Sequence, residues 1–241
     1  VPDDFRLFAR PDVPQTEAPA APTAAAPTVE NVGDDLVYST VGRVAGYGTN
    51  DPLLTRAWKA SGIKGSIDDV LRYLESSKNV PEDYRAIANA LKKSGKLAGL
   101  RIEPESVIKS WFPNLTPDQL RNVGGGYNPN IHAMTLTKAG QNAETVLHEM
   151  LHAATSRALE TDSAFKTQMD ELLAHVNANL RDVDRDFMTA LQEQRFDHGI
   201  AGFKSNAHEL LAYGLTNREV QAILRNISAP PGSTASSAWE W

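Results

Sequence analysis

Two histidines stand four residues apart in a segment that is well suited to form one long helix. The segment runs from Asn142 to Leu159 and contains neither proline nor glycine. Asn142 is a suitable N-cap, and Glu144 places a favourable negative charge in the first turn. Because residues i and i+4 lie on one face of a helix, His148 and His152 can reach a single metal ion.

The absence of cysteine limits the kinds of metal site that the chain can form. None of the 241 residues is a cysteine, so disulfide bonds are excluded, and any metal must be held by histidine and carboxylate side chains. Glu149 follows the first histidine and completes an H-E-x-x-H pattern. In this pattern the glutamate is placed to take a proton from a metal-bound water.

A zinc site of this kind needs a third protein ligand. Metzincins place glycine and histidine at the positions that Thr155 and Ala158 occupy here, so that class is excluded. The segment 206–213, in a later predicted helix, offers His208 and Glu209. These two side chains point about 100° apart on a helix, so only one of them can face the metal.

Charge and hydropathy argue against two classes of partner. The formal net charge is −6 and no basic run of five or more residues occurs, so nucleic-acid binding is not indicated. The apolar runs are far shorter than the roughly 20 residues that a membrane span needs. No signal peptide is visible, and because the first residue is Val1, we expect the sequence to be processed or cut from a longer chain.

Composition predicts a chain of several parts. Residues 11–33 are rich in Ala, Pro and Thr and have almost no bulky apolar side chain, which indicates an extended linker; a segment held along the domain surface is the alternative. Helix starts at Asp51, Ser66 and Pro81 indicate a small helical region before the main domain. The predicted parts are a linker (1–35), a helical lead-in (36–95), the main domain (96–228) and a tail (229–241).

The main domain is predicted to be α+β and mainly helical, with a small antiparallel sheet. Residues 98–103 alternate apolar and polar side chains, and 131–136 follow an Asn-Pro-Asn turn, so both are expected to be strands. A stripe of apolar residues with steps of four and three, from Phe165 to Leu191, predicts a long amphipathic helix. Further helices are predicted at 205–214 and 217–227.

Two segments resemble a family of metallopeptidases. His148–Thr155 reads HEMLHAAT, and GGGYNPNIHAMTL precedes it at 124–136. This combination resembles the zincin-like peptidase domains of large phage and mobile-element polyproteins. HELLAYGLTN at 208–217 resembles their second motif, and also a segment of anthrax lethal factor-like peptidases. The resemblance covers about 98–227.

The resemblance implies a zincin-like core of the gluzincin type with one bound Zn²⁺. The implied ligands are His148, His152 and Glu209, because glutamate is the usual third ligand of gluzincins, and the implied general base is Glu149. Thermolysin-like enzymes carry an aspartate four residues after the third ligand, and it orients a ligand histidine. Tyr213 stands there in this chain, so the ligand histidines must be oriented in another way.

The strand at 131–136 is expected to bind substrate. In zincins the strand before the metal helix is commonly an edge strand, whose free backbone groups can pair with an extended peptide. The expected substrate-binding residues are Ile131, His132, Ala133 and Met134. A lone histidine such as His132 is otherwise a surface or hydrogen-bonded residue. The glycines at 124–126 would let a substrate approach closely, or would simply form a turn.

Peptide hydrolysis also needs a donor that stabilises the oxyanion. Tyr213 lies one helical turn after Glu209 and on the same face, which makes it the first candidate; a tyrosine of the hydrophobic core is the alternative. His208 and Tyr127 are further candidates.

Two functions remain open. The first is a zinc endopeptidase that cleaves protein or peptidoglycan peptides, as a module of a phage particle protein or polyprotein that acts in the virion or in the host cell. The second is a structural or DNA-ejection protein of the virion that has a zincin fold with little or no activity. Glu149 favours the first, because an inactive site has no need of a base beside its ligands.

Overall fold

The computed structural model describes residues 37–40, 51–64, 66–183, 203–204 and 206–241. The chain divides into two units, Val1–Gly33 and Asp34–Trp241. The predicted linker at 1–35 lies outside the described residues, as does the 184–191 part of the predicted amphipathic stripe.

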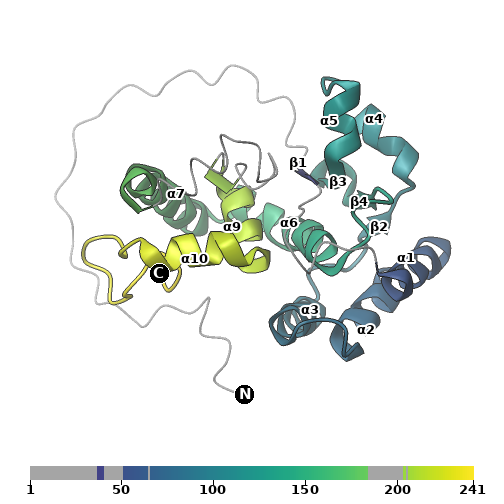
Figure 1. Cartoon of the computed structure of the whole chain (residues 1–241), viewed down its shortest axis with the longest axis horizontal. Coiled ribbons are helices and arrows are strands. Elements are labelled where there is room, and N and C mark those ends of the chain that lie inside the picture. Colours follow the sequence, from purple (N-terminus) through teal and green to yellow (C-terminus); the bar gives the residue numbers. More distant parts are fainter. Residues whose placement is uncertain (1–36, 41–50, 65, 184–202, 205) are drawn as a thin grey trace. The chain divides into compact units, whose positions relative to one another are not determined.

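The described part is α+β and mainly helical, with one small mixed sheet (Figure 1). The strands are β1 (Val37–Thr40), β2 (Arg101–Ile102), β3 (Val123–Asn128) and β4 (Ala133–Leu136). The longer helices are α1 (Pro52–Lys64), α2 (Asp68–Ser76), α3 (Glu82–Ser94), α6 (Ala143–Thr161), α7 (Ser163–Val183), α9 (Ala207–Thr216) and α10 (Arg218–Asn226). Short helices α4 (Ile108–Trp111) and α5 (Pro117–Asn122) precede β3.

The three lead-in helices begin close to the starts that the sequence predicts. The Asp51 side chain accepts hydrogen bonds from the first turn of α1, and Ser66 Oγ accepts one from the Asp68 amide at the start of α2. Pro81 is the N-cap of α3, and Gly95 ends that helix with a φ of 66°, a left-handed conformation that glycine adopts without a steric penalty.

The sheet differs from the antiparallel sheet that was predicted. Its strand order is β1-β3-β4-β2; β3 is antiparallel to β1 and β4, but β2 is parallel to β4. The backbone amides of Arg101 and Glu103 donate to the carbonyls of His132 and Met134. β4 is therefore an internal strand, and the expectation of a free edge at 131–136 is wrong.

Helix α6 joins the parts that composition had suggested were separate. It packs against β3, β4, α3 and α9. Leu147 and Met150 of α6 belong to one hydrophobic core with residues of α1, α2 and α3, so the lead-in helices and the main domain share a single core. A second core unites α7, α9 and α10, and includes Ala238 and Trp239. The end of the predicted tail thus folds back on α10, where the amides of Ala238 and Trp239 donate to carbonyls of Ile227 and Leu224.

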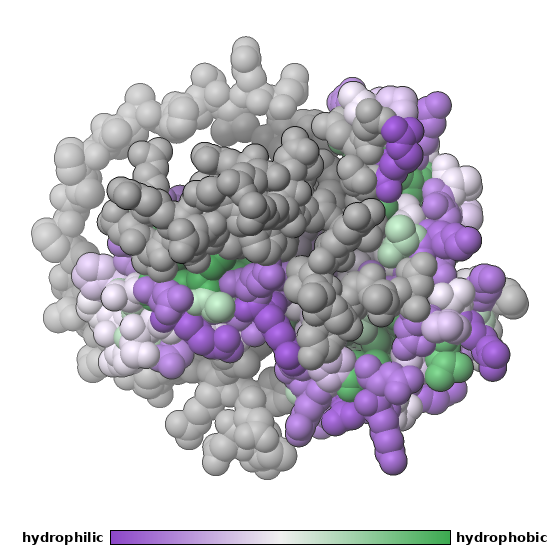
Figure 2. Space-filling view, in the orientation of Figure 1, coloured by the Kyte–Doolittle hydropathy of each residue, from purple (hydrophilic) through white to green (hydrophobic). Residues whose placement is uncertain are grey.

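The visible surface of the described part is mostly hydrophilic, and the apolar residues on it form small separate areas (Figure 2). The large hydrophobic side chains that are exposed among the described residues are Leu53 and Ile131. None of the described helices is long and apolar enough to span a membrane.

Candidate metal centre

The first two candidate ligands lie on α6, which begins with a regular N-cap. The Asn142 side chain accepts a hydrogen bond of 2.9 Å from the amide of Thr145, as an N-cap does. One turn further on, His148 and His152 lie on the same face of the helix, and their Nε2 atoms are 2.9 Å apart. The spacing of four residues therefore brings both imidazoles to one point, as the sequence predicts.

The third candidate ligand comes from the first turn of α9. Asn206 caps this helix by accepting a hydrogen bond of 2.9 Å from the amide of Glu209. The carboxylate of Glu209 lies 3.2 Å from His148 Nε2 through Oε2 and 3.6 Å from His152 Nε2 through Oε1. Within the described residues these three side chains form a cluster that could hold a metal ion, and His208 is not part of it.

The spacing of the three donors fits a small divalent cation. Zinc binds histidine nitrogen and carboxylate oxygen at roughly 2.0–2.2 Å, so two ligands of a tetrahedral site lie about 3.3 Å apart. The separations in the cluster are 2.9, 3.2 and 3.6 Å. Small shifts of the side chains are enough to place one ion at bonding distance from all three.

The charge of the cluster also favours a cation. Burial alone would raise the pKa of Glu209, but the charge of His152 and hydrogen bonds from both histidines outweigh it and lower this pKa to about 2. Glu209 is therefore ionised at neutral pH, the form that binds metal. Its carboxylate is buried, and burying a negative charge is costly unless a positive partner offsets it. A divalent cation would offset that cost.

Glu149 lies between α6 and the sheet. Its side chain touches β3, because a Cβ added to Gly125 would lie 3.1 Å from Glu149 Cγ. Glu149 and His152 are 0% exposed and His148 is 1% exposed. None of these three side chains is therefore open to solvent in this conformation.

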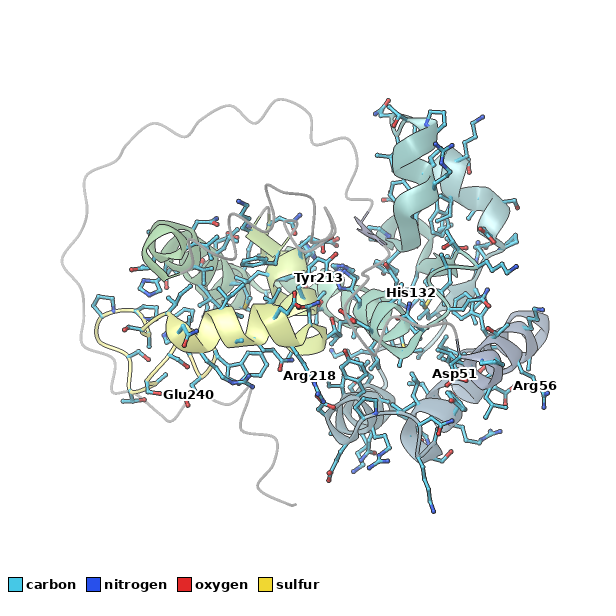
Figure 3. The ribbon with its side chains drawn as sticks, in the orientation of Figure 1. Asp51, Arg56, His132, Tyr213, Arg218 and Glu240 are labelled. Atoms are coloured by element: carbon cyan, nitrogen blue, oxygen red, sulfur yellow. The ribbon has the colours of Figure 1, made fainter. Side chains whose placement is uncertain are left out.

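The other residues predicted to act in the site lie in different places, Tyr213 beside a candidate ligand and the rest in or near the sheet. The ring of Tyr213 lies against the ring of His148, with centroids 4.3 Å apart, and Figure 3 shows it on α9 at the side of α6. The Tyr127 hydroxyl lies 2.9 Å from His132 Nδ1, so these two residues contact each other. Ala133 and Met134 are fully buried, and Ile131 and His132 precede β4 instead of belonging to it.

Sequence reasoning missed the residues that hold α9 against the rest of the site. Asn217, directly after α9, donates a hydrogen bond of 2.8 Å to Glu144 in the first turn of α6 and also caps α10. The hydroxyl of Tyr84, from α3, donates to the Thr216 carbonyl at 2.6 Å. These contacts join residues 73 and 132 positions apart, so no local pattern could have revealed them.

The two ligand histidines of α6 have identifiable neighbours in the structure. Tyr213 stands where thermolysin-like enzymes have an aspartate, and its ring packs on the ring of His148. Within the described residues, His152 Nδ1 is buried without a hydrogen-bond partner. The imidazoles are therefore held by the Glu209 carboxylate, by the Tyr213 ring on His148 and by their own helix.

No protein-family model, no curated protein and no solved structure matches this chain.

Proposed function

We propose that the protein is a zinc-dependent endopeptidase whose centre is formed by His148, His152 and Glu209. The observation that supports this most is the convergence of three buried donors from two helices, with Glu149 directly beside the first. Two histidines and a glutamate are a ligand set that catalytic zinc commonly has, with the fourth position left for water or substrate. When bound, zinc polarises a peptide carbonyl and lowers the pKa of its water to about 7.

Glu149 has the role of general base. It follows the ligand His148 directly in the sequence, and its side chain lies against Gly125 of β3. It takes one proton from the attacking water and passes that proton to the nitrogen of the leaving amine as the C–N bond breaks. The buried surroundings keep competing water away from this transfer.

Tyr213 is proposed to stabilise the oxyanion. It lies one turn after Glu209, and its ring packs on His148, so its position depends on that of two ligands. The same contact also stabilises the orientation of His148. A Tyr213→Phe variant separates these effects, because phenylalanine keeps the ring contact but has no hydroxyl: zinc binding should persist while cleavage falls.

The test of the function combines metal analysis with one substitution. We expect about one zinc per purified chain by mass spectrometry, because one set of three ligands converges. Glu149→Gln should keep that zinc, since glutamine has the same size, but peptide cleavage should fall by about 10²–10⁴-fold, the usual contribution of a positioned general base. A peptide library and cell-wall peptides would serve as substrates.

Three results would contradict the proposal in different ways. A chain that takes up no zinc from micromolar solution has no centre of this kind. Loss of zinc in Glu149→Gln would make Glu149 a ligand instead of a base. Zinc without turnover would favour a metal-stabilised structural protein, a second candidate that the complete burial of the centre supports.

A further inference from the structure

Two rows of side chains meet where α6 packs against α9. Each row has steps of four residues, so it lies along one face of its helix. The row on α6 is Glu144, His148 and His152, and the row on α9 and its C-cap is Glu209, Tyr213 and Asn217. Four of these six residues have been described as ligands or neighbours of ligands, and the remaining two are the first of one row and the last of the other.

The contacts between the rows run in opposite directions along the two helices. At one end the carboxylate of Glu209 lies 3.2 and 3.6 Å from the two histidine Nε2 atoms. In the middle the ring of Tyr213 lies against that of His148. At the other end Asn217 Nδ2 donates to Glu144 Oε1 at 2.8 Å. Asn217 follows Glu209 by eight residues, which is about 12 Å of helix.

The side-chain amide of Asn217 has a fixed orientation. Its Oδ1 accepts hydrogen bonds of 3.0 Å from the amides of Glu219 and Val220 at the start of α10, so its Nδ2 has to point the other way, towards Glu144. Its backbone amide donates to the Tyr213 carbonyl at 2.8 Å, and the residue is 2% exposed. One buried residue therefore ends α9, starts α10 and ties both helices to the first turn of α6.

This hydrogen bond defines the register of α9 more strictly than apolar packing does. Leu210 and Ala212 of α9 are buried in two different hydrophobic cores, and apolar contacts have no preferred direction. A hydrogen bond depends on distance and angle, and loss of the donor leaves the acceptor unsatisfied. A slip of α9 by one turn, about 5.4 Å, would break the bond and carry Glu209 away from both histidines.

We propose that Glu144 and Asn217 are positioning residues of the metal centre, because their hydrogen bond sets the register of α9 on α6 and thereby brings Glu209 to the two histidines. The inference rests on the proposed function, since it concerns the ligands of the same centre. Neither residue is a ligand; both act through the helices that carry the ligands. Zinc affinity then depends on a hydrogen bond about two helical turns away from the carboxylate ligand.

The test exchanges donor and acceptor in the full-length chain. Asn217→Asp keeps the size and the capping oxygen, but it replaces the donor by a second carboxylate that faces Glu144. Adding Glu144→Gln restores one donor and one acceptor with their places exchanged, and the pair regains its original total charge. The control is Gln221→Glu, which also replaces a buried amide by a carboxylate. That amide donates to the Leu215 carbonyl at 3.1 Å, a contact between α9 and α10 that does not involve α6.

Zinc affinity is measured by competition with a chromophoric chelator at pH 8, well above the ordinary pKa of carboxyl groups. We expect Asn217→Asp to bind zinc at least about tenfold more weakly than the unaltered chain, and the exchanged pair and the control to stay within about threefold of it. Unchanged affinity in Asn217→Asp would overturn the inference. An exchanged pair, or a control, that is as weak as Asn217→Asp would also overturn it.

A second measurement needs no zinc. The chain has no cysteine, so spin labels can be attached at Arg157→Cys of α6 and Ala222→Cys of α10, two exposed positions. Pulsed electron paramagnetic resonance then reports the distance between the labels in the zinc-free chain. We expect Asn217→Asp to broaden the distribution of distances and the exchanged pair to narrow it again. The same distribution in all three chains would contradict the inference.

The two measurements separate this inference from the proposed function. If no chain takes up zinc, the proposed function fails, and the label distances still decide whether Glu144 and Asn217 set the register of α9. If Asn217→Asp does not fold, a folded chain with the exchanged pair supports the inference, and an unfolded one contradicts it.

Discussion

A methyl group added at Gly125 tests the contact between β3 and the proposed base. In Gly125→Ala the new Cβ would lie 2.8 Å from Leu136 Cδ2, 3.0 Å from the Thr135 carbonyl oxygen and 3.1 Å from Glu149 Cγ. All three distances are shorter than ordinary van der Waals contacts of about 3.5–4.0 Å. The Thr135 carbonyl belongs to the backbone of β4 and cannot move alone, so the two side chains must give way.

Overpacking of this kind costs about 1–3 kcal/mol. We expect the free energy of unfolding of Gly125→Ala, from urea denaturation of the zinc-loaded chain, to fall by about that amount. Zinc content should stay unchanged, because none of the three crowded atoms belongs to a proposed metal ligand. Cleavage should fall further than the loss of folded protein explains, since Glu149 is one of the groups displaced.

Gly62→Ala is the matched control. This glycine lies inside α1, and its added Cβ would meet Ile102 Cγ2 at 3.7 Å, an ordinary contact. Alanine there should stabilise the chain by about 0.4–1 kcal/mol, because it restricts the unfolded state. If both variants were as stable as the unaltered chain and cleaved peptide at the same rate, the reasoning about β3 and Glu149 would be refuted.

Three further predictions concern the metal centre and its support. Glu209→Ala should lose zinc, whereas His208→Ala, one residue away but outside the cluster, should keep it; mass spectrometry of both proteins checks this, and the reverse result would make His208 the ligand. Tyr84→Phe should lower the free energy of unfolding by about 1–3 kcal/mol, because it leaves the buried Thr216 carbonyl without its hydroxyl donor; an unchanged urea midpoint would show that this contact has no weight. Chelation of zinc should lower the melting temperature, and restoring free zinc to 100 times its Kd should return about 2.7 kcal/mol of stability; equal melting curves with and without metal would exclude zinc binding to the folded chain alone.

Helix α6, which carries His148 and His152, could be predicted because its sequence signals are local. Asn142 caps the helix, the absence of proline and glycine keeps it continuous, and a spacing of four residues puts His148 and His152 together whatever surrounds them. The sequence offered Glu209 and His208 as candidates for the third ligand. The choice between them depended on how α9 lies against α6.

The parts that sequence analysis placed wrongly depend on which segments are neighbours. Nothing in 131–136 indicates that β2, a strand of two residues, pairs with β4 in parallel and removes its free edge. The tail offers no periodicity, yet Ala238 and Trp239 pack on α10. In the sequence, the lead-in helices look like a separate region, because an amphipathic stripe does not show which element packs against it. In the structure that element is α6.

The sequence by itself therefore determined the longer helices, the pair of histidines and the limitation to nitrogen and oxygen ligands, since each follows from residue types at short spacing. Tertiary structure alone decided that Glu209 converges with that pair, that Gly125 lies on Glu149, and that β1 covers the outer edge of β3. The physical reason is that a helix face is set by its own backbone periodicity, whereas a contact between distant segments is set by the packing of the whole core.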